Sequence, residues 1–156
     1  MISPEIAERR KRRITGRWPR FAPAWALANA HLQTWYGTLL RAPPALPYRA
    51  ETWSTPDDDF LVVHIAEAGA RGPVAILLHG LEGSAQSPYV VGMGQRLRTL
   101  GYTVVAMEQR SCSGRINRAR RLYHSGVTDD LDFVVRRVHE RWPDRPLFVG
   151  GVSLGG

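Results

Sequence analysis

Apolar residues in the second half of the chain follow two patterns, short continuous runs and stripes at helical spacing. Continuous runs at 74–78, 102–107 and 147–149 are typical of buried strands in a parallel sheet. Between them, stretches from about 88 to 100 and from about 128 to 142 place apolar side chains on one helical face. The stripes comprise Val90, Met93, Leu97 and Leu100 in the first stretch, and Leu131, Val134, Val135, Val138 and Trp142 in the second.

Two further runs, 48–54 and 60–66, flank the turn-forming cluster 55–59 and predict a hairpin ahead of the buried strands. Strands and helices that alternate with short links predict an α/β fold, with a mostly parallel sheet between flanking helices. We expect three parts in the chain. A basic arm spans 1–20, an N-terminal extension spans 21–47, and the α/β domain spans 48–156.

Composition is that of an ordinary globular protein, with 44% hydrophobic and 22% charged residues. A single cysteine, Cys112, excludes an internal disulfide and fits a reducing compartment, so we expect a cytoplasmic protein. The net charge of +7 is concentrated in the arm and in a second arginine cluster at 110–121. A solvated arm is one interpretation, and weak peripheral contact with anionic membrane surfaces is another. The uncharged stretch 21–40 is too polar for a membrane span.

The strongest chemical signal is Gly151-Val152-Ser153-Leu154-Gly155, directly behind the apolar run that ends at Val149. A G-x-S-x-G after a buried strand is typical of a nucleophile elbow, where a sharp strand-to-helix turn exposes a serine hydroxyl. Such a site also needs backbone N–H donors from the loop after an earlier strand. The loop His79-Gly80-Leu81-Glu82-Gly83, which follows the run 74–78, has the glycines that such a loop requires.

Several segments together resemble the YheT-like subfamily of α/β-hydrolases. They are His31-Leu32-Gln33-Thr34, the loop at 79–83, Arg110-Ser111-Cys112-Ser113-Gly114, Tyr123-His124-Ser125-Gly126 and the elbow at 151–156. The resemblance implies an α/β-hydrolase fold that this chain carries only as far as the nucleophile elbow. It also implies a serine esterase or acylglycerol lipase with a Ser-Asp-His triad and with no cofactor or metal.

Carried over residue by residue, the resemblance makes Ser153 the nucleophile. Leu81 and Leu154 match the positions whose backbone N–H groups form the oxyanion hole, and His79 and Gly80 belong to the oxyanion loop. The triad Asp and His match no position here, because in the family they lie in a C-terminal half. We expect them, in that order, in a chain extended past Gly156.

None of the five histidines is a good candidate for the missing base, and we expect His79 to shape its loop by hydrogen bonding. The expected partner is a small ester or acylglycerol. Two other interpretations stay open. The chain as it stands is a catalytically inactive fragment, or it is a basic nucleic-acid-binding module, which explains the arginines but not the setting of Ser153.

Overall fold

The computed structural model describes residues 22–25, 28–36, 45–69 and 71–156. The basic arm at 1–20 lies outside these residues. By its internal contacts the chain divides into two units, Met1–Arg41 and Ala42–Gly156. In the first unit the described residues include a short helix, α2 (Ala30–Trp35), whose N-cap Asn29 accepts hydrogen bonds from the amides of His31 and Leu32. No helix in the described part of the chain is long and apolar enough to span a membrane.

The second unit contains a five-stranded sheet with the order β1-β2-β4-β3-β5. The strands are β1 (Arg49–Ser54), β2 (Phe60–Ala66), β3 (Val74–Leu78), β4 (Thr103–Met107) and β5 (Leu147–Gly151). β1 and β2 form the predicted hairpin, and β2 pairs antiparallel with β4. β3 lies between β4 and β5 and is parallel to both. The predicted α/β class is therefore confirmed, and the sheet is mixed, with the parallel strands β4, β3 and β5 beside the predicted hairpin.

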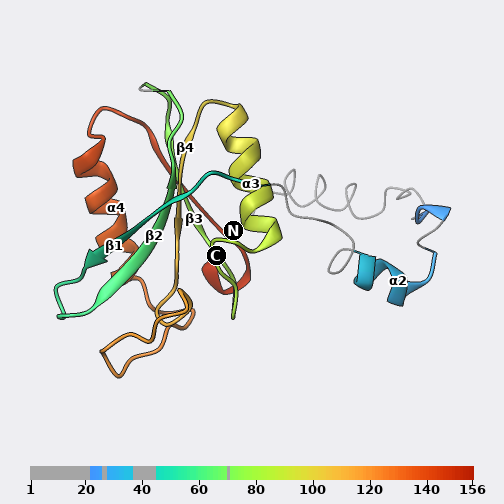
Figure 1. Ribbon diagram of the computed structural model, residues 1–156, viewed down its shortest axis with the longest axis horizontal. Helices are drawn as coiled ribbons and strands as arrows, with labels where there is room; N and C mark the ends of the chain where they lie inside the picture. Colours follow the sequence, from blue (N-terminus) through green and yellow to red (C-terminus); the bar gives the residue numbers. More distant parts are fainter. Residues whose placement is uncertain (1–21, 26–27, 37–44, 70) are drawn as a thin grey trace, which may run out of the picture. The chain divides into compact units, whose positions relative to one another are not determined.

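Two helices cover opposite faces of the sheet, so the unit has three layers (Figure 1). α4 (Asp129–Arg141) packs through Val134 and Val138 against the face that carries Ile76 and Val105. α3 (Pro88–Thr99) packs through Val90 on the other face, against Leu77, Val104 and Ala106. Successive side chains of β3 and β4 thus pack on opposite faces of the sheet, and both faces are covered by a helix. This is why both strands appear in the sequence as continuous apolar runs.

The predicted apolar stripe of α3 was wrong at two positions. Met93 and Leu100 are 37% and 59% exposed, whereas the buried face of the helix comprises Val90, Val91 and Gly94. At Gly94 the helix packs closely against Leu46, in the chain ahead of β1, and against Val104 of β4. A Cβ on Gly94 would lie 2.8 Å from Leu46 Cδ2 and 3.4 Å from Val104 Cγ1. A glycine that faces the core has no apolar side chain, so the hydrophobic pattern misplaced the stripe.

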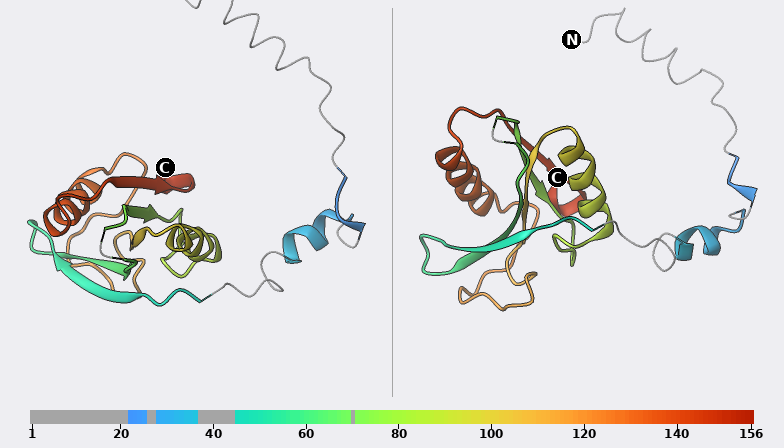
Figure 2. Two further views of the ribbon diagram at one scale, coloured as in Figure 1. Left: turned by 90° about the horizontal axis from the view of Figure 1, so that it is seen from above. Right: turned by 45° about the horizontal axis from the view of Figure 1, so that its top comes forward.

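The parallel strands bring three loops to one end of the sheet, since the carboxyl ends of parallel strands lie at the same edge. These loops are 79–87 after β3, 108–128 after β4 and the elbow after β5. β5 and β1 form the two edges of the sheet (Figure 2). On β5, Phe148 and Val149 are 53% and 49% exposed, so this edge strand presents apolar side chains on both faces.

Candidate active site

The chain turns sharply after β5 into a short 3₁₀ helix, η3 (Ser153–Gly155). Ser153 has φ +56°, a left-handed conformation that costs a residue other than glycine about 1–3 kcal/mol. The turn is held by hydrogen bonds from Val152 N–H to the Leu78 carbonyl (3.2 Å) and from Gly155 N–H to the Val152 carbonyl (3.0 Å). The serine side chain is exposed. This strained geometry is that of a nucleophile elbow.

Glycines flank the serine because the backbone passes too close for a side chain. A Cβ on Gly151 would overlap the carbonyl of Gly155. A Cβ on Gly155 would lie 2.6 Å from the His79 carbonyl oxygen and 2.9 Å from the Leu78 Cβ and carbonyl oxygen. The elbow therefore rests directly on the carboxyl end of β3, where the loop at 79–83 begins.

That loop adjoins the serine. A Cβ placed on Gly80 would lie 3.3 Å from Ser153 Cβ and 3.2 Å from the Val152 carbonyl oxygen. Gly80 thus leaves the space into which the serine fits. The structure brings together all the residues that the sequence assigned to the site, namely His79, Gly80, Leu81, Ser153 and Leu154, although their roles stay predictions.

The carbonyl of Gly80 fixes the orientation of the Leu81 amide. It accepts hydrogen bonds from His79 Nδ1 (2.7 Å) and from Gly83 N–H (3.1 Å). Because a peptide group is planar and trans, the Leu81 N–H points away from these two donors. In the described part of the chain, no hydrogen bond uses the backbone N–H of Leu81 or of Leu154. Both amides thus remain available to bind an oxyanion.

His79 is 1% exposed and has both ring nitrogens engaged. Nε2 accepts the Gln109 N–H at 3.0 Å, so the ring proton lies on Nδ1 and is donated to Gly80. This agrees with the expected role of His79 in shaping the loop. Neither nitrogen is free to take a proton from the serine.

Glu108 lies beneath the loop and was not singled out by the sequence. It is buried, and Oε1 accepts the Ala85 N–H (3.0 Å) and pairs with His64 Nε2 (3.1 Å). Burial alone would raise the pKa of Glu108, but the neighbouring His64 and His79 rings and the hydrogen bond from the Ala85 N–H outweigh it and lower the pKa to about 2. Glu108 is therefore an anionic support for the chain that leads into α3.

Arg110, the first residue of the motif at 110–114, is buried and serves a structural network. Its guanidinium binds Asp130 through two hydrogen bonds of 2.7 Å, Asp59 at 2.7 Å and Asp57 at 3.0 Å. These carboxylates raise the pKa of Arg110 further above its usual range, with Asp130 the main cause. In the sequence, Asp57 and Asp59 belong to the turn-forming cluster 55–59 and Asp130 to the predicted helical stretch from about 128, and only the fold joins them to Arg110.

Two tyrosine hydroxyls reach the loop from other elements. Tyr89 Oη, from the first turn of α3, accepts the Gly80 N–H at 2.9 Å. Tyr123 Oη, from the long loop after β4, accepts the Glu82 N–H at 2.8 Å. Tyr123 belongs to a segment that the sequence singled out without a role, and Tyr89 had no distinguishing signal.

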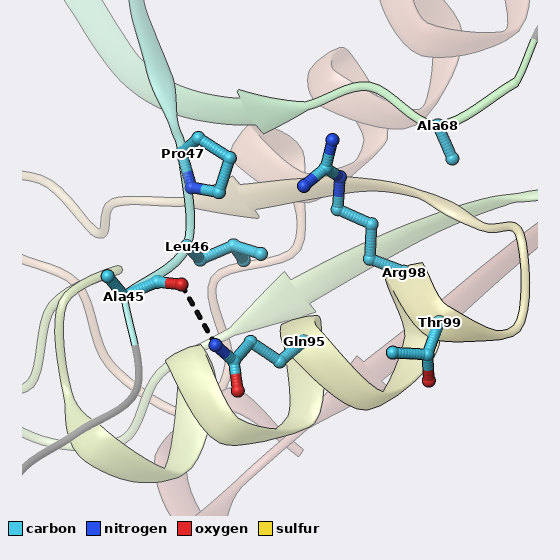
Figure 3. A pocket seen from close by; sticks show the side chains of 7 residues that line it. All are labelled: Ala45, Leu46, Pro47, Ala68, Gln95, Arg98 and Thr99. Atoms are coloured by element: carbon cyan, nitrogen blue, oxygen red, sulfur yellow. Dashed lines mark hydrogen bonds between the residues drawn. The ribbon is translucent and has the colours of Figure 1, made fainter.

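The described residues include two surface grooves away from Ser153. One, of about 470 Å³, lies between the chain ahead of β1 and α3; Figure 3 shows Gln95 donating to the Ala45 carbonyl there, with Arg98 alongside. The other, of about 380 Å³, borders Arg110 and Asp130. Neither groove is lined by a residue of the elbow or of the loop at 79–83. Among the described residues there is no cluster of three or more side chains that could hold a metal ion.

No family model matches the sequence, but several curated proteins do. The chain is 35% identical to YheT of Escherichia coli (strain K12) over 139 residues, which cover 87% of this chain and 41% of that protein. It is 31% identical to Phospholipase ABHD3 of Bos taurus, covering 80% of this chain and 32% of that protein. It is 29% identical to Monoacylglycerol lipase of Saccharomyces cerevisiae, covering 69% of this chain and 23% of that protein. The chain spans less than half the length of each relative.

Solved structures show the same fold. An alpha-beta serine hydrolase homologue from Coxiella burnetii matches with a TM-score of 0.58 and 22% identity, covering 69% of this chain and 52% of that chain. The Pyrococcus furiosus esterase Pf2001 matches with a TM-score of 0.58 and 20% identity, covering 88% of this chain and 48% of that chain. The expected α/β-hydrolase fold, carried in part by this chain, is confirmed.

Proposed function

Because the chain belongs to the YheT-like subfamily of α/β-hydrolases, we propose that it supplies the nucleophile and the oxyanion hole of a serine enzyme that hydrolyses carboxylic esters. The observation that carries the proposal is the setting of Ser153. Its strained backbone, at φ +56°, lies against a loop whose Leu81 N–H has no partner among the described residues.

The names of two relatives support the substrate class. Phospholipase and monoacylglycerol lipase both describe lipid hydrolases, and each aligns with more than two thirds of this chain. We therefore propose a short-chain carboxylic ester or a monoacylglycerol as substrate. The exposed side chain of Leu81, 70% accessible in the oxyanion loop, offers an apolar contact beside the nucleophile.

The proposed reaction has two half-reactions. A base takes the proton of the Ser153 hydroxyl as Oγ bonds to the ester carbonyl carbon, and the negative charge moves to the carbonyl oxygen. The N–H groups of Leu81 and Leu154 bind this oxyanion. The carbon–alkoxy bond then breaks, the alcohol leaves with the proton, and the acyl group stays on Oγ. Water, deprotonated by the same base, attacks the acyl-enzyme and releases the acid.

Four of the five histidines lie in the second unit, Ala42–Gly156, and we propose that none of these four is the base. His79 has both nitrogens engaged, His64 pairs with Glu108, and His124 Nδ1 accepts the Gly126 N–H. His139 is exposed on α4. We propose that the base and its acid come from a segment that follows the elbow in the full-length protein, as the family resemblance implies.

The test is covalent labelling of the full-length protein with a fluorophosphonate probe, followed by mass spectrometry of the labelled peptide. We expect label on Ser153, no label in Ser153→Ala, and undiminished label in Ser54→Ala, which changes an exposed serine on β1. A folded, monodisperse wild-type protein that stays unlabelled would refute the proposed function. So would a label that persists in Ser153→Ala.

A further inference from the structure

The oxyanion loop contains a turn whose shape is unfavourable for its sequence. Gly83 N–H binds the Gly80 carbonyl at 3.1 Å, which closes a four-residue turn. Within it, Glu82 has φ +52°, in the left-handed region that a residue other than glycine rarely adopts. Such a turn tends to relax unless neighbouring groups hold its peptides, so the position of the Leu81 N–H depends on what holds the turn.

Two hydroxyls hold it from opposite sides. Tyr89 Oη accepts the amide N–H just before Leu81, from Gly80, and Tyr123 Oη accepts the one just after, from Glu82. The amides of Gly80, Glu82 and Gly83 are thus all occupied, while that of Leu81 has no partner among the described residues. Because each N–H has a fixed acceptor, the peptides on either side of the Gly80–Leu81 peptide cannot rotate without breaking a hydrogen bond.

The surroundings show that these hydroxyls are built into the loop. A Cβ on Gly83 would lie 2.8 Å from Tyr89 Oη, so glycine at this position is what admits the hydroxyl. The Tyr123 ring meets the His79 ring edge-on at 6.5 Å, while its hydroxyl accepts the Glu82 N–H. The ring contact with buried His79 therefore helps to fix where the Tyr123 oxygen lies.

We propose that Tyr89 and Tyr123 are positioning residues for the oxyanion hole, a tyrosine clamp that holds the turn so that the Leu81 N–H faces the Ser153 side. The clamp rests on the proposed function, since it acts on the amide that binds the oxyanion. Loss of a hydroxyl lets the strained turn relax and weakens transition-state stabilisation, while ground-state binding of the ester is unaffected.

The experiment measures kcat and KM of the full-length protein on a short-chain p-nitrophenyl ester, for Tyr89→Phe, Tyr123→Phe and the double variant. Removal of one oxyanion donor costs about 10²–10³-fold in kcat, so loss of a group that only positions the donor should cost about 5–20-fold. KM should stay within about twofold. The kcat of the double variant should fall by less than the product of the two single-variant factors, because both hydroxyls hold the same short segment.

Tyr102→Phe is the matched control. Tyr102 contacts the Phe148 ring, and no hydrogen bond in the described part of the chain uses its hydroxyl, so its kcat should equal that of the wild type. Rates are expressed per Ser153 that reacts with the fluorophosphonate, which removes any effect of unfolded protein.

Unchanged kcat in both single variants would overturn the clamp, and so would a rise in KM with kcat unchanged, since that would indicate a substrate contact. If one variant fails to fold, the other carries the test, because the two hydroxyls bind different amides. Failure of both to fold would also overturn the clamp, as their role would then be structural. A wild-type protein without Ser153-dependent turnover would instead refute the proposed function.

Discussion

Replacement of Arg110 by methionine should destabilise the fold more than any surface substitution. The guanidinium is 98% buried and binds Asp130 by two hydrogen bonds of 2.7 Å and Asp59 by one of 2.7 Å. The side chains of Asp59 and Asp130 are 0% and 6% exposed. Methionine has a similar length, so Arg110→Met leaves two buried carboxylates without their shared cation and opens little space.

Breaking a buried ion pair by removal of one partner costs about 3–5 kcal/mol. The loss should lie near the lower end here, about 3 kcal/mol, because both carboxylates keep other donors. Asp59 still accepts from the Asn117 side chain (3.0 Å) and from two backbone amides, and Asp130 still accepts from Arg121 (2.9 Å). A loss of this size changes the ratio of folded to unfolded protein by about two powers of ten.

The assay is urea unfolding of the full-length protein at pH 7, followed by far-UV circular dichroism. The matched control is Arg118→Ala, since the Arg118 side chain is 69% exposed and its ion pair with Asp58, at 3.6 Å, is open to solvent. That variant should change the free energy of unfolding by less than about 0.5 kcal/mol. An Arg110→Met protein as stable as Arg118→Ala would show that the buried network does not stabilise the fold.

Three further predictions concern pH, the elbow and the isolated chain. Burial raises the pKa of Asp59, but hydrogen bonds from the backbone N–H of residue 118, the Asn117 side chain and the backbone N–H of residue 119 lower it from 3.8 to about 2. The ionised Asp59 therefore contributes about 2 kcal/mol to the free energy of unfolding. This contribution is complete above pH 4 and is lost as the pH falls toward 2. Unfolding measured against pH should show this loss, and Asp59→Asn should make the loss smaller by about 2 kcal/mol, with the share of Glu108 remaining; an unchanged profile would contradict the prediction. Gly155→Ala places a Cβ 2.6 Å from a backbone carbonyl and should slow fluorophosphonate labelling of Ser153 by about 10²-fold, whereas Gly69→Ala, with open space around it, should label normally. The 156-residue chain alone should hydrolyse no p-nitrophenyl ester above its Ser153→Ala control, because loss of a triad member costs about 10⁴-fold; Ser153-dependent turnover would reveal a base among the residues present.

Local patterns were enough to locate most elements and the sharp turn at Ser153. β2 and β3 have the bounds that the apolar runs predicted, and β4 begins one residue later, at Thr103. The elbow could be predicted because its geometry depends on neighbours in sequence, the glycines that a tight turn requires on both sides of Ser153. The buried face of α3 could not, since a core position filled by Gly94 leaves no hydrophobic signal.

The sequence by itself determined the class of fold and the position of the sharp turn at Ser153, because hydrophobic period and turn chemistry act over a few residues. Only the tertiary structure decided which polar groups support the site. Tyr123 meets the Glu82 amide across 41 residues, and Arg110 meets Asp59 across 51. The strand order β1-β2-β4-β3-β5 brings such distant segments together. A hydrogen bond needs its donor and acceptor within about 3 Å, and no local pattern along the chain encodes that distance.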